Sequence, residues 1–368
     1  MFFQIFFQNN YYLWFLDSKM ENRNKFKLFL PAISSAKNSG VTLVAADVRH
    51  EETFVGLYRA ENQEVILKNE AVYHTQNFDS VIEILKDFIS KNSDEKISRV
   101  AVAVPGPVIA GKSEPQRLPW KLDAEKIKND LQVEKVFLIN DLEASAYGLC
   151  SVSEKNIYTV YKSENFTPGN VAILAPGAGL GEAGLFWDGE SLRPFATEGG
   201  HCEFSPRTND EVEFYQFLNK IYGIVSWETV LSTSGLFNIY RFVRDIKRQK
   251  QPEFLTKAIE EGNFTEAVIN GALENKDRIC NVTIDTFLVF MAREANSLVL
   301  KLKATGGLIL SGEIPMLLEK FLKNKTFYKH FIISDKMESV LKDIPIYLVK
   351  DKNSIINGAA SYAAFFED

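Results

Sequence analysis

The chain has 368 residues, of which 46% are hydrophobic and 24% are charged. These proportions are typical of a globular protein, and the length is sufficient for about two domains. The net charge of -6 argues against a nucleic-acid partner, because a basic surface is needed to displace counterions from phosphates.

The three cysteines, Cys150, Cys202 and Cys280, are far apart in the sequence and lack the short spacing of metal-binding pairs. We therefore expect neither a disulfide framework nor a structural zinc site. A reducing, cytoplasmic location is the default for such a chain.

The first 38 residues differ from the rest of the chain. Residues 1–19 are rich in aromatic side chains but lack the basic start and the cleavage site of a signal peptide. Polar residues interrupt any membrane-spanning helix there, and Met20 offers an alternative start. We interpret residues 1–38 as an N-terminal extension, disordered or artefactual, with a surface helix or a membrane-contacting segment as alternatives.

Strands and helices alternate from residue 41 onward. Apolar, β-branched runs predict buried strands, and apolar residues at helical spacing predict the helices between them. The first group comprises strands at 41–48, 53–59, 64–67, 97–104 and 136–139, with helices at 78–91 and 124–131. This alternation indicates a mostly parallel sheet with crossover helices.

A second cycle of strands and helices begins at residue 170. Its predicted elements are strands at 171–174, 308–311 and 346–349, a hairpin-like run to Phe195, and helical regions at 210–303 and 355–365. Two similar halves predict an α/β fold with two domains and a ligand-binding cleft between them. We expect a small domain of residues 39–150 plus 351–368, and a large domain of residues 151–350.

Asn140 and Asp141 stand at the end of a predicted buried strand and at the start of a helix. A carboxylate beside a side-chain amide at the end of a strand is suited to orienting a hydroxyl and accepting its proton. The same pair is also an ordinary helix cap. These residues alone are consistent with both roles.

A glycine-rich turn follows the predicted strand at 171–174 and contains Gly177, Ala178, Gly179 and Gly181. Backbone N–H groups in such a turn can face an anion without interference from Cβ atoms. The spacing matches neither a dinucleotide-binding motif nor a P-loop, and a purely structural turn is the alternative.

Glu198 and His201 are separated by two glycines. Together they can accept and donate hydrogen bonds to several hydroxyl groups, as a sugar requires. A metal site or a buried, capped histidine is the alternative, although no third metal ligand matches. Glu228 adds a carboxylate near a predicted helix start, a position where most glutamates are caps or solvated.

Glycines also stand on both sides of the predicted strand at 308–311, namely Gly306, Gly307 and Gly312. They are consistent with close approach of the backbone to a flat ligand, or simply with tight turns.

In this order and spacing, the motifs resemble the bacterial glucokinase family of sugar kinases, over roughly residues 41–365. The resemblance rests on segments 139–144, 177–181, 198–201, 227–232 and 306–312. It implies the two-domain ribonuclease-H-like (actin-like ATPase) fold. It also implies ATP-dependent phosphorylation of glucose to glucose 6-phosphate, with Mg2+ accompanying the nucleotide, and a homodimer that binds neither nucleic acid nor membrane.

The resemblance also implies a role for each matching residue. Asp141 would accept the proton of the sugar 6-hydroxyl, and no protein residue would bind a metal directly. The sugar-binding residues would be Asn140, Glu198, His201 and Glu228. The ATP-binding residues would be Asp47, Gly177, Ala178, Gly179, Gly181, Gly306, Gly307 and Gly312.

The chain departs from the family pattern at positions expected to face ligands. The first phosphate loop of the family has glycines after the strand aspartate, whereas Asp47 is followed here by Val48 and then by Arg49-His50-Glu51-Glu52. Each carboxylate so placed would repel ATP by about a kcal/mol or more at short range, while Arg49 could pair with phosphate directly. Two further departures are Gln116-Arg117, where the family has threonine and asparagine, and Ala178, where threonine is common.

These departures leave a second class of function open. The alternative to a glucokinase is a catalytically impaired homologue that binds a sugar or acts as a regulatory protein. A kinase for another hexose, such as mannose or an amino sugar, is a further possibility.

Overall fold

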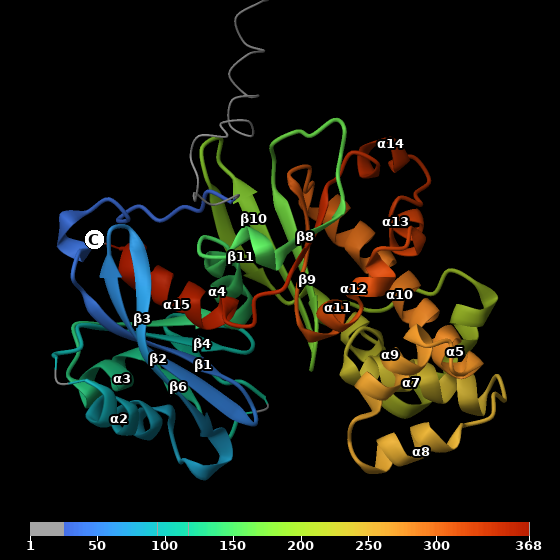
Figure 1. The fold of residues 1–368 in the computed structure, drawn as a ribbon, viewed down its shortest axis with the longest axis horizontal. Coiled ribbons are helices and arrows are strands. Elements are labelled where there is room, and N and C mark those ends of the chain that lie inside the picture. The colour runs from blue at the N-terminus through green and yellow to red at the C-terminus, as the bar shows by residue number, and fades with distance from the viewer. Residues whose placement is uncertain (1–25, 94, 117, 368) are drawn as a thin grey trace, which may run out of the picture.

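The structure is a computed structural model that describes residues 26–93, 95–116 and 118–367, and its strands form two large sheets (Figure 1). The first sheet has the strand order β3-β2-β1-β4-β7. β1, β4 and β7 are parallel to one another, and β2 and β3 extend the sheet in antiparallel fashion. The bounds are β1 (Thr42–Val48), β2 (Glu52–Glu61), β3 (Glu64–His74), β4 (Arg99–Val104) and β7 (Lys135–Asn140).

The second sheet repeats this arrangement, with the order β11-β10-β9-β12-β13-β8. β9, β12 and β13 are parallel, while β10, β11 and β8 are antiparallel to their neighbours. The bounds are β8 (Ile157–Tyr161), β9 (Val171–Pro176), β10 (Leu180–Trp187), β11 (Leu192–Thr197), β12 (Gly307–Leu310) and β13 (Ile346–Val349). A small separate sheet pairs β5 (Lys112–Ser113) with β6 (Leu122–Asp123).

Helices cover both faces of the first sheet. Alternate side chains of β1 point to opposite faces, so Val44 and Ala46 join the apolar core under α2, while Leu43 and Ala45 join the core under α4 and α15. Burial on both faces explains why the strand is apolar almost throughout. The helices are α2 (Val81–Asn92), α3 (Ala124–Leu131), α4 (Asp141–Gly148) and α15 (Ser354–Phe365).

α10 is a 25-residue helix that packs on one face of the second sheet, beside α7, α9 and α13. The helices of this half are α5 (Asn209–Tyr222), α6 (Trp227–Val230), α7 (Thr233–Asp245), α8 (Glu253–Glu260), α9 (Phe264–Leu273), α10 (Arg278–Leu302), α11 (Glu313–Leu317), α12 (Glu319–Leu322), α13 (Thr326–Phe331) and α14 (Glu338–Leu341). Short 3-10 helices are η1 (Ala36–Asn38), η2 (Thr75–Asn77), η3 (Glu154–Asn156) and η4 (Gly199–His201).

α4 and α15 cross each other at glycines and lie between the two sheets (Figure 1). A Cβ atom at Gly358 would overlap the carbonyl oxygen of Ala144, and one at Gly148 would overlap the carbonyl oxygen of Ser354. The apolar core around this crossing contains residues of both sheets. The strands thus divide between residues 39–150 and 151–350, with α15 packing against β1 and β4. The domain boundaries stay a prediction.

Residues 26–38 form a strap, which we call the N-terminal strap, along the edge of the second sheet. Phe29 N donates to Leu192 O at 2.9 Å, and Leu192 N donates to Lys27 O at 2.8 Å. The guanidinium of Arg193 lies 3.7 Å from the centre of the Phe29 ring. These contacts fix the first part of the strap to β11.

The strap continues to the C-terminal end of α15. Ala32 N donates to Phe365 O at 2.9 Å, and the buried Arg99 donates to Asn38 Oδ1 at 2.6 Å. Arg99 also donates to the last carbonyls of α15, those of Ala363 and Ala364. Residues 26–38 are therefore packed against β11 and α15. Residues 1–25, the rest of the expected extension, lie outside the described part of the chain.

Several element boundaries also differ from expectation. α2 begins at Val81 rather than at residue 78, because the Ser80 side chain caps it by accepting from Glu83 N. β3 extends to His74, and β8 was not predicted. No helix in the described part of the chain is long and apolar enough to cross a membrane.

Candidate functional site

Asp47 and Asp141 lie at the same edge of the first sheet, because β1, β4 and β7 are parallel and in register. Asp47 pairs with Ala103 on β4, and Val104 pairs with Asn140, the residue before Asp141. The carboxyl ends of parallel strands are where ligands bind in α/β proteins. The topology thus brings together two carboxylates that are 94 positions apart in the sequence.

Asp47 is buried and paired with Arg49. The Asp47 Oδ2 atom accepts from Arg49 Nη2 at 2.5 Å and from Arg49 Nε at 2.9 Å. The other oxygen, Oδ1, is buried and has no hydrogen-bond partner among the described residues. Burial raises the pKa of Asp47, and the charge of Arg49 opposes that rise. Arg49 thus neutralises one of the acidic groups at this edge.

Asn140 is the N-cap of α4, as one of the two interpretations expected. Its Oδ1 accepts from Leu142 N at 3.0 Å and from Glu143 N at 3.1 Å. Its Nδ2 donates to Gly106 O at 3.0 Å. The cap role does not exclude a sugar contact, because the amide nitrogen carries a second hydrogen.

Asp141 is the first residue of α4 and is partly buried. Its pKa is raised to about 7, chiefly by burial and also by the charges of Asp47 and Glu198, while Leu142 N and Arg49 oppose the rise. Leu142 N donates to Asp141 Oδ1 at 2.8 Å. A carboxyl group with a pKa near neutrality can act as a general base at physiological pH.

Glu198 is the N-cap of η4, and His201 is the last residue of that turn, which follows β11. Both side chains are exposed, and Glu198 Oε2 lies 4.0 Å from His201 Nε2. Glu198 is near enough to Asp141 for its charge to raise the pKa of that carboxyl group. The alternative of a buried histidine is wrong, and within the described ranges no group of three metal-ligating side chains is found.

Glu228 lies in the first turn of α6 and supports the glycine-rich turn. Its Oε2 accepts from Leu180 N at 3.0 Å, and a Cβ atom at Gly179 would come within 2.5 Å of the same oxygen. Glycine at position 179 is therefore needed for the carboxylate to reach the turn. Glu228 is neither a helix cap nor a freely solvated side chain.

The glycine-rich turn joins β9 to β10. Gly177 N donates to Gly179 O at 2.8 Å, and Gly177 O accepts from both the N and the Oγ1 of Thr233 on α7. Ala178 is exposed at the tip. A Cβ atom at Gly181 would instead come within 2.9 Å of the Leu142 side chain, so that glycine allows β10 to pack on α4.

Gly306 and Gly307 lie away from the edge that carries Gly177, and their role in ATP binding stays a prediction. Gly307 pairs with Val171, the first residue of β9, whereas Gly177 follows the last residue of that strand. Gly306 N donates to Asn170 O at 2.9 Å. Both glycines therefore lie at the opposite end of the sheet, where they allow tight chain packing.

Gly312 follows the carboxyl end of β12, so it lies at the same end of the second sheet as the glycine-rich turn. Its φ of +87° suits glycine, and a Cβ atom there would come within 2.7 Å of Pro176 O, next to the glycine-rich turn. The next residue, Glu313, was missed by the sequence analysis. It is near enough to Arg49 for its charge to raise the pKa of that guanidinium.

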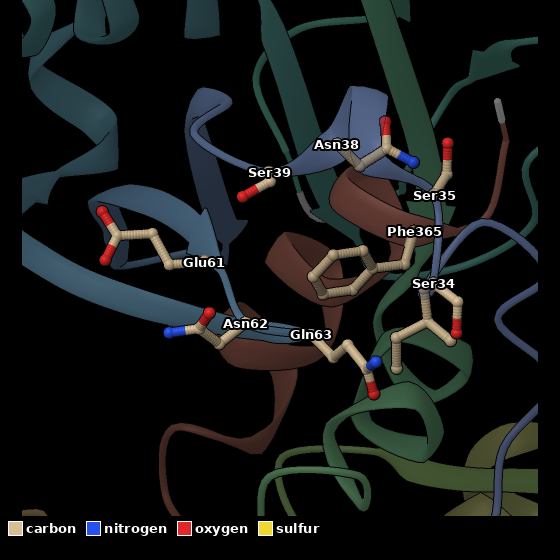
Figure 2. A pocket seen from close by; sticks show the side chains of 9 residues that line it. Ser34, Ser35, Asn38, Ser39, Glu61, Asn62, Gln63 and Phe365 are labelled. Carbon is tan, nitrogen blue, oxygen red and sulfur yellow. The ribbon is translucent and has the colours of Figure 1, made fainter.

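A pocket of about 140 Å³ lies elsewhere, between the N-terminal strap and the turn from β2 to β3 (Figure 2). Asn62 and Gln63 of that turn and Phe365 of α15 contribute to its lining. The turn is at the opposite end of β2 from Arg49, so the pocket is separate from the candidate site.

Comparisons with known proteins agree with this geometry. The glucokinase family model matches residues 44–365. The glucokinase of Nostoc punctiforme is 28% identical over 338 residues, which is 88% of this chain and 98% of that protein. A glucokinase structure from an Antarctic psychrotroph superposes with a TM-score of 0.73 at 23% identity, covering 88% of this chain and 98% of its own. The glucokinase of Balamuthia mandrillaris, solved in complex with glucose, superposes with a TM-score of 0.72 at 18% identity, covering 90% and 96%.

The structural likeness confirms the expected α/β, actin-like ATPase fold. The family match extends over most of the chain and includes every residue of the candidate site. The protein therefore belongs to the glucokinase family.

Proposed function

We propose that this protein transfers the γ-phosphoryl group of ATP to the 6-hydroxyl of glucose. The observation that carries the proposal is the position of Asp141, a partly buried carboxylate at the carboxyl end of the parallel strands, where the charges of Glu198, Asp47 and Arg49 act on it. Its pKa of about 7 suits a base that accepts a proton from a hydroxyl group.

The exposed Glu198 and His201, together with Asn140 and Glu228, would bind the sugar. Glu198 accepts hydrogen bonds, and His201 can donate or accept them, so the pair suits neighbouring hydroxyls. Asn140 Nδ2 donates one hydrogen to Gly106 O and carries a second one that a sugar hydroxyl could accept. Glu228 would place its carboxylate beside the sugar while its Oε2 holds Leu180 N.

The ATP phosphates would lie between the two sheets, near the glycine-rich turn and Arg49. Gly177 offers an uncrowded approach, because a Cβ atom there would find only Glu313 N, at 4.0 Å. Arg49 can exchange its contact with Asp47 for one with phosphate. Mg2+ would fit beside the unpartnered Oδ1 of Asp47, and when bound with ATP it offsets the phosphate charge.

The reaction requires little covalent chemistry from the protein. Asp141 accepts the proton of the sugar 6-hydroxyl as that oxygen forms a bond to the γ-phosphorus. The bond from the γ-phosphorus to the bridging oxygen breaks, and ADP leaves with the electron pair. The protein mainly positions the two substrates, and general-base assistance contributes about a hundredfold to ten-thousandfold.

ADP release from Mg-ATP in the presence of a panel of hexoses tests the proposal. We expect glucose-dependent turnover that exceeds the rate with mannose or glucosamine. Stabilisation by glucose in a thermal shift assay without any ADP release would instead indicate an impaired homologue that only binds sugar. Equal rates with mannose would show that the substrate is a broader class of hexoses.

The cytoplasmic location and the homodimer implied by the family resemblance stay predictions. Size-exclusion chromatography with light scattering checks the oligomeric state.

A further inference from the structure

Two glutamate side chains are buried together between β10 and α10, outside the candidate site. Glu182 on β10 is 2% exposed, and Glu294 on α10 is fully buried. Three of their four carboxyl oxygens, Glu182 Oε1 and both of Glu294, have no hydrogen-bond partner in the described part of the chain. Burying carboxyl groups in this way is costly unless their charge is reduced.

Glu182 is in direct contact with the turn that carries the candidate sugar-binding residues. A Cβ atom at Gly199 would overlap Glu182 Oε2. Gly199 N donates to Thr197 Oγ1 at 3.2 Å, and that hydroxyl donates to Glu182 O at 2.9 Å. The backbone and the carboxyl group of Glu182 therefore both support the turn that places Glu198 and His201.

The nearby positive charge is insufficient for two carboxylates. Lys301 Nζ lies 3.6 Å from Glu294 Oε1, but its side chain is 57% exposed. Arg293, the next cation on α10, already pairs with Glu211 Oε2 at 2.5 Å and donates to Ser205 O at 2.6 Å. One of the two acids must therefore be neutral, so that the charge of the buried pair does not exceed the positive charge near it.

The other surroundings of the pair do not change this balance. On the neighbouring strands, Glu182 is paired with the uncharged residues Leu174 and Thr197. The titratable groups nearby on η4 and α6 are Glu198, His201 and Glu228, and none of them is a cation held against the pair. Burial raises the pKa of both acids, and the charge of Glu182 raises that of Glu294 further.

We infer that Glu182 and Glu294 share one proton, and that this protonated pair is a positioning device that holds the Gly199 turn ready for the sugar hydroxyls. The inference rests on the proposed function. A shared proton joins two adjacent carboxyl groups, as in other acid dyads. Its loss would leave two charges side by side, and their repulsion would push Glu182 against Gly199.

The affinity for glucose should therefore depend on the protonation of this pair, whereas the rate of the chemical step should not. As the pH rises above neutrality the pair loses its proton, and the turn no longer holds Glu198 and His201 in place. KM for glucose should then rise by up to about tenfold per pH unit, the limit for one linked proton. The value of kcat at saturating glucose should not follow this change.

The test compares KM for glucose between about pH 6 and about pH 9 in the wild type and in Glu294→Gln. The amide imitates a protonated acid at every pH, so the KM of the variant should stay flat where that of the wild type rises. Glu182→Gln should behave in the same way. Glu190→Gln, an exposed residue at the turn between β10 and β11, is the matched control and should follow the wild type.

Lys301→Met provides a second variant at an exposed position, which should fold even if the buried substitutions do not. Removing this cation strengthens proton retention by the pair, so the rise in KM should move to higher pH. A wild-type KM that is constant over the range, or an unshifted rise in Lys301→Met, would overturn the inference.

Absence of glucose-dependent ADP release at every pH refutes the proposed function instead. Glucose binding measured by calorimetry over the same pH range would then decide the inference about the pair.

Discussion

Arg49→Ala probes the point at which the chain departs most from its family pattern. Arg49 stands where a glycine-containing phosphate loop is usual, and it is ion-paired with the buried Asp47 at 2.5 Å. Removing the guanidinium should have two separable effects: Asp47 loses its only described ion-pair partner, and the phosphate site loses its cation.

The expected loss of stability follows from the exposure of the two side chains. Breaking a fully buried ion pair by removing one partner costs about 3–5 kcal/mol. The Asp47 side chain is 3% exposed, but that of Arg49 is 47% exposed and solvent screens it, so we expect about 1–3 kcal/mol. Because burial raises the pKa of Asp47, the loss should be larger at about pH 8 than at about pH 5, where the neutral acid needs no cation.

Urea unfolding measures this loss, and steady-state kinetics measures the effect on ATP. We expect KM for ATP to rise about tenfold, since a charge-assisted hydrogen bond contributes about 1.5–3 kcal/mol and part of that is offset by the contact with Asp47. KM for glucose should not change. Arg59→Ala is the matched control. Arg59 lies near the end of β2 that is remote from Arg49, and its partly exposed side chain pairs with Glu61 and with Glu95.

The double variant Asp47→Asn/Arg49→Ala separates the two effects. It removes the uncompensated charge, so stability should recover relative to Arg49→Ala alone while KM for ATP stays high. An unchanged or lower KM for ATP in Arg49→Ala would refute the assignment of Arg49 to the phosphate site. It would indicate instead that Arg49 serves only to neutralise Asp47.

Three further predictions concern the helix crossing, the strap and the base. Gly358→Ala would force Ala144 away at the crossing of α4 and α15 and should lower the free energy of unfolding by about 1–3 kcal/mol; an unchanged urea midpoint would contradict the close crossing. Asn38→Ala removes the acceptor of the buried Arg99 and should cost about 1–3 kcal/mol in the same assay, whereas a wild-type midpoint would show that the strap does not support the core. The pKa of Asp141, about 7, predicts that kcat rises with pH through neutrality as the base becomes ionised, and a flat profile between about pH 6 and about pH 8 would contradict this role.

Much of the first sheet and its functional edge could be predicted from local patterns. The apolar run before Asn140 and Asp141 marks a strand, and parallel pairing then requires Asp47 to lie at the same edge. That strand is half-buried over most of its length rather than buried, because β7 is the last strand of its sheet. The strands could be predicted because they depend on neighbours in the sequence and on one simple rule of topology, whereas the chemistry of the glycine-rich turn and of Glu198 and His201 stays a prediction.

Other features depend on contacts that no local pattern records. Glycines on both sides of β12 do not reveal which end of the strand faces the ligand, so the sequence could not distinguish Gly306 and Gly307 from Gly312. Glu313 has no motif of its own and is noticed only because the fold brings its charge near enough to act on Arg49.

The strap was missed for a similar reason. Its buried residues, Phe26, Leu28, Leu30 and Ala32, alternate with exposed or partly exposed ones, and the sequence on either side, at 20–25 and 34–38, is mainly polar. Four apolar positions at strand spacing are too few to outweigh that composition. Their partners on β11 and α15 lie more than 150 residues away.

The most direct test of the proposed function is the turnover of Asp141→Asn at saturating glucose and Mg-ATP, alongside its affinity for glucose. Asp130→Asn, on the exposed side of α3, is the matched control. The asparagine keeps the shape of the side chain and removes the base, so kcat should fall by about a hundredfold to ten-thousandfold while glucose binding by calorimetry is retained. A kcat within about twofold of the wild type would contradict the assignment of Asp141 as the base that accepts the proton from glucose.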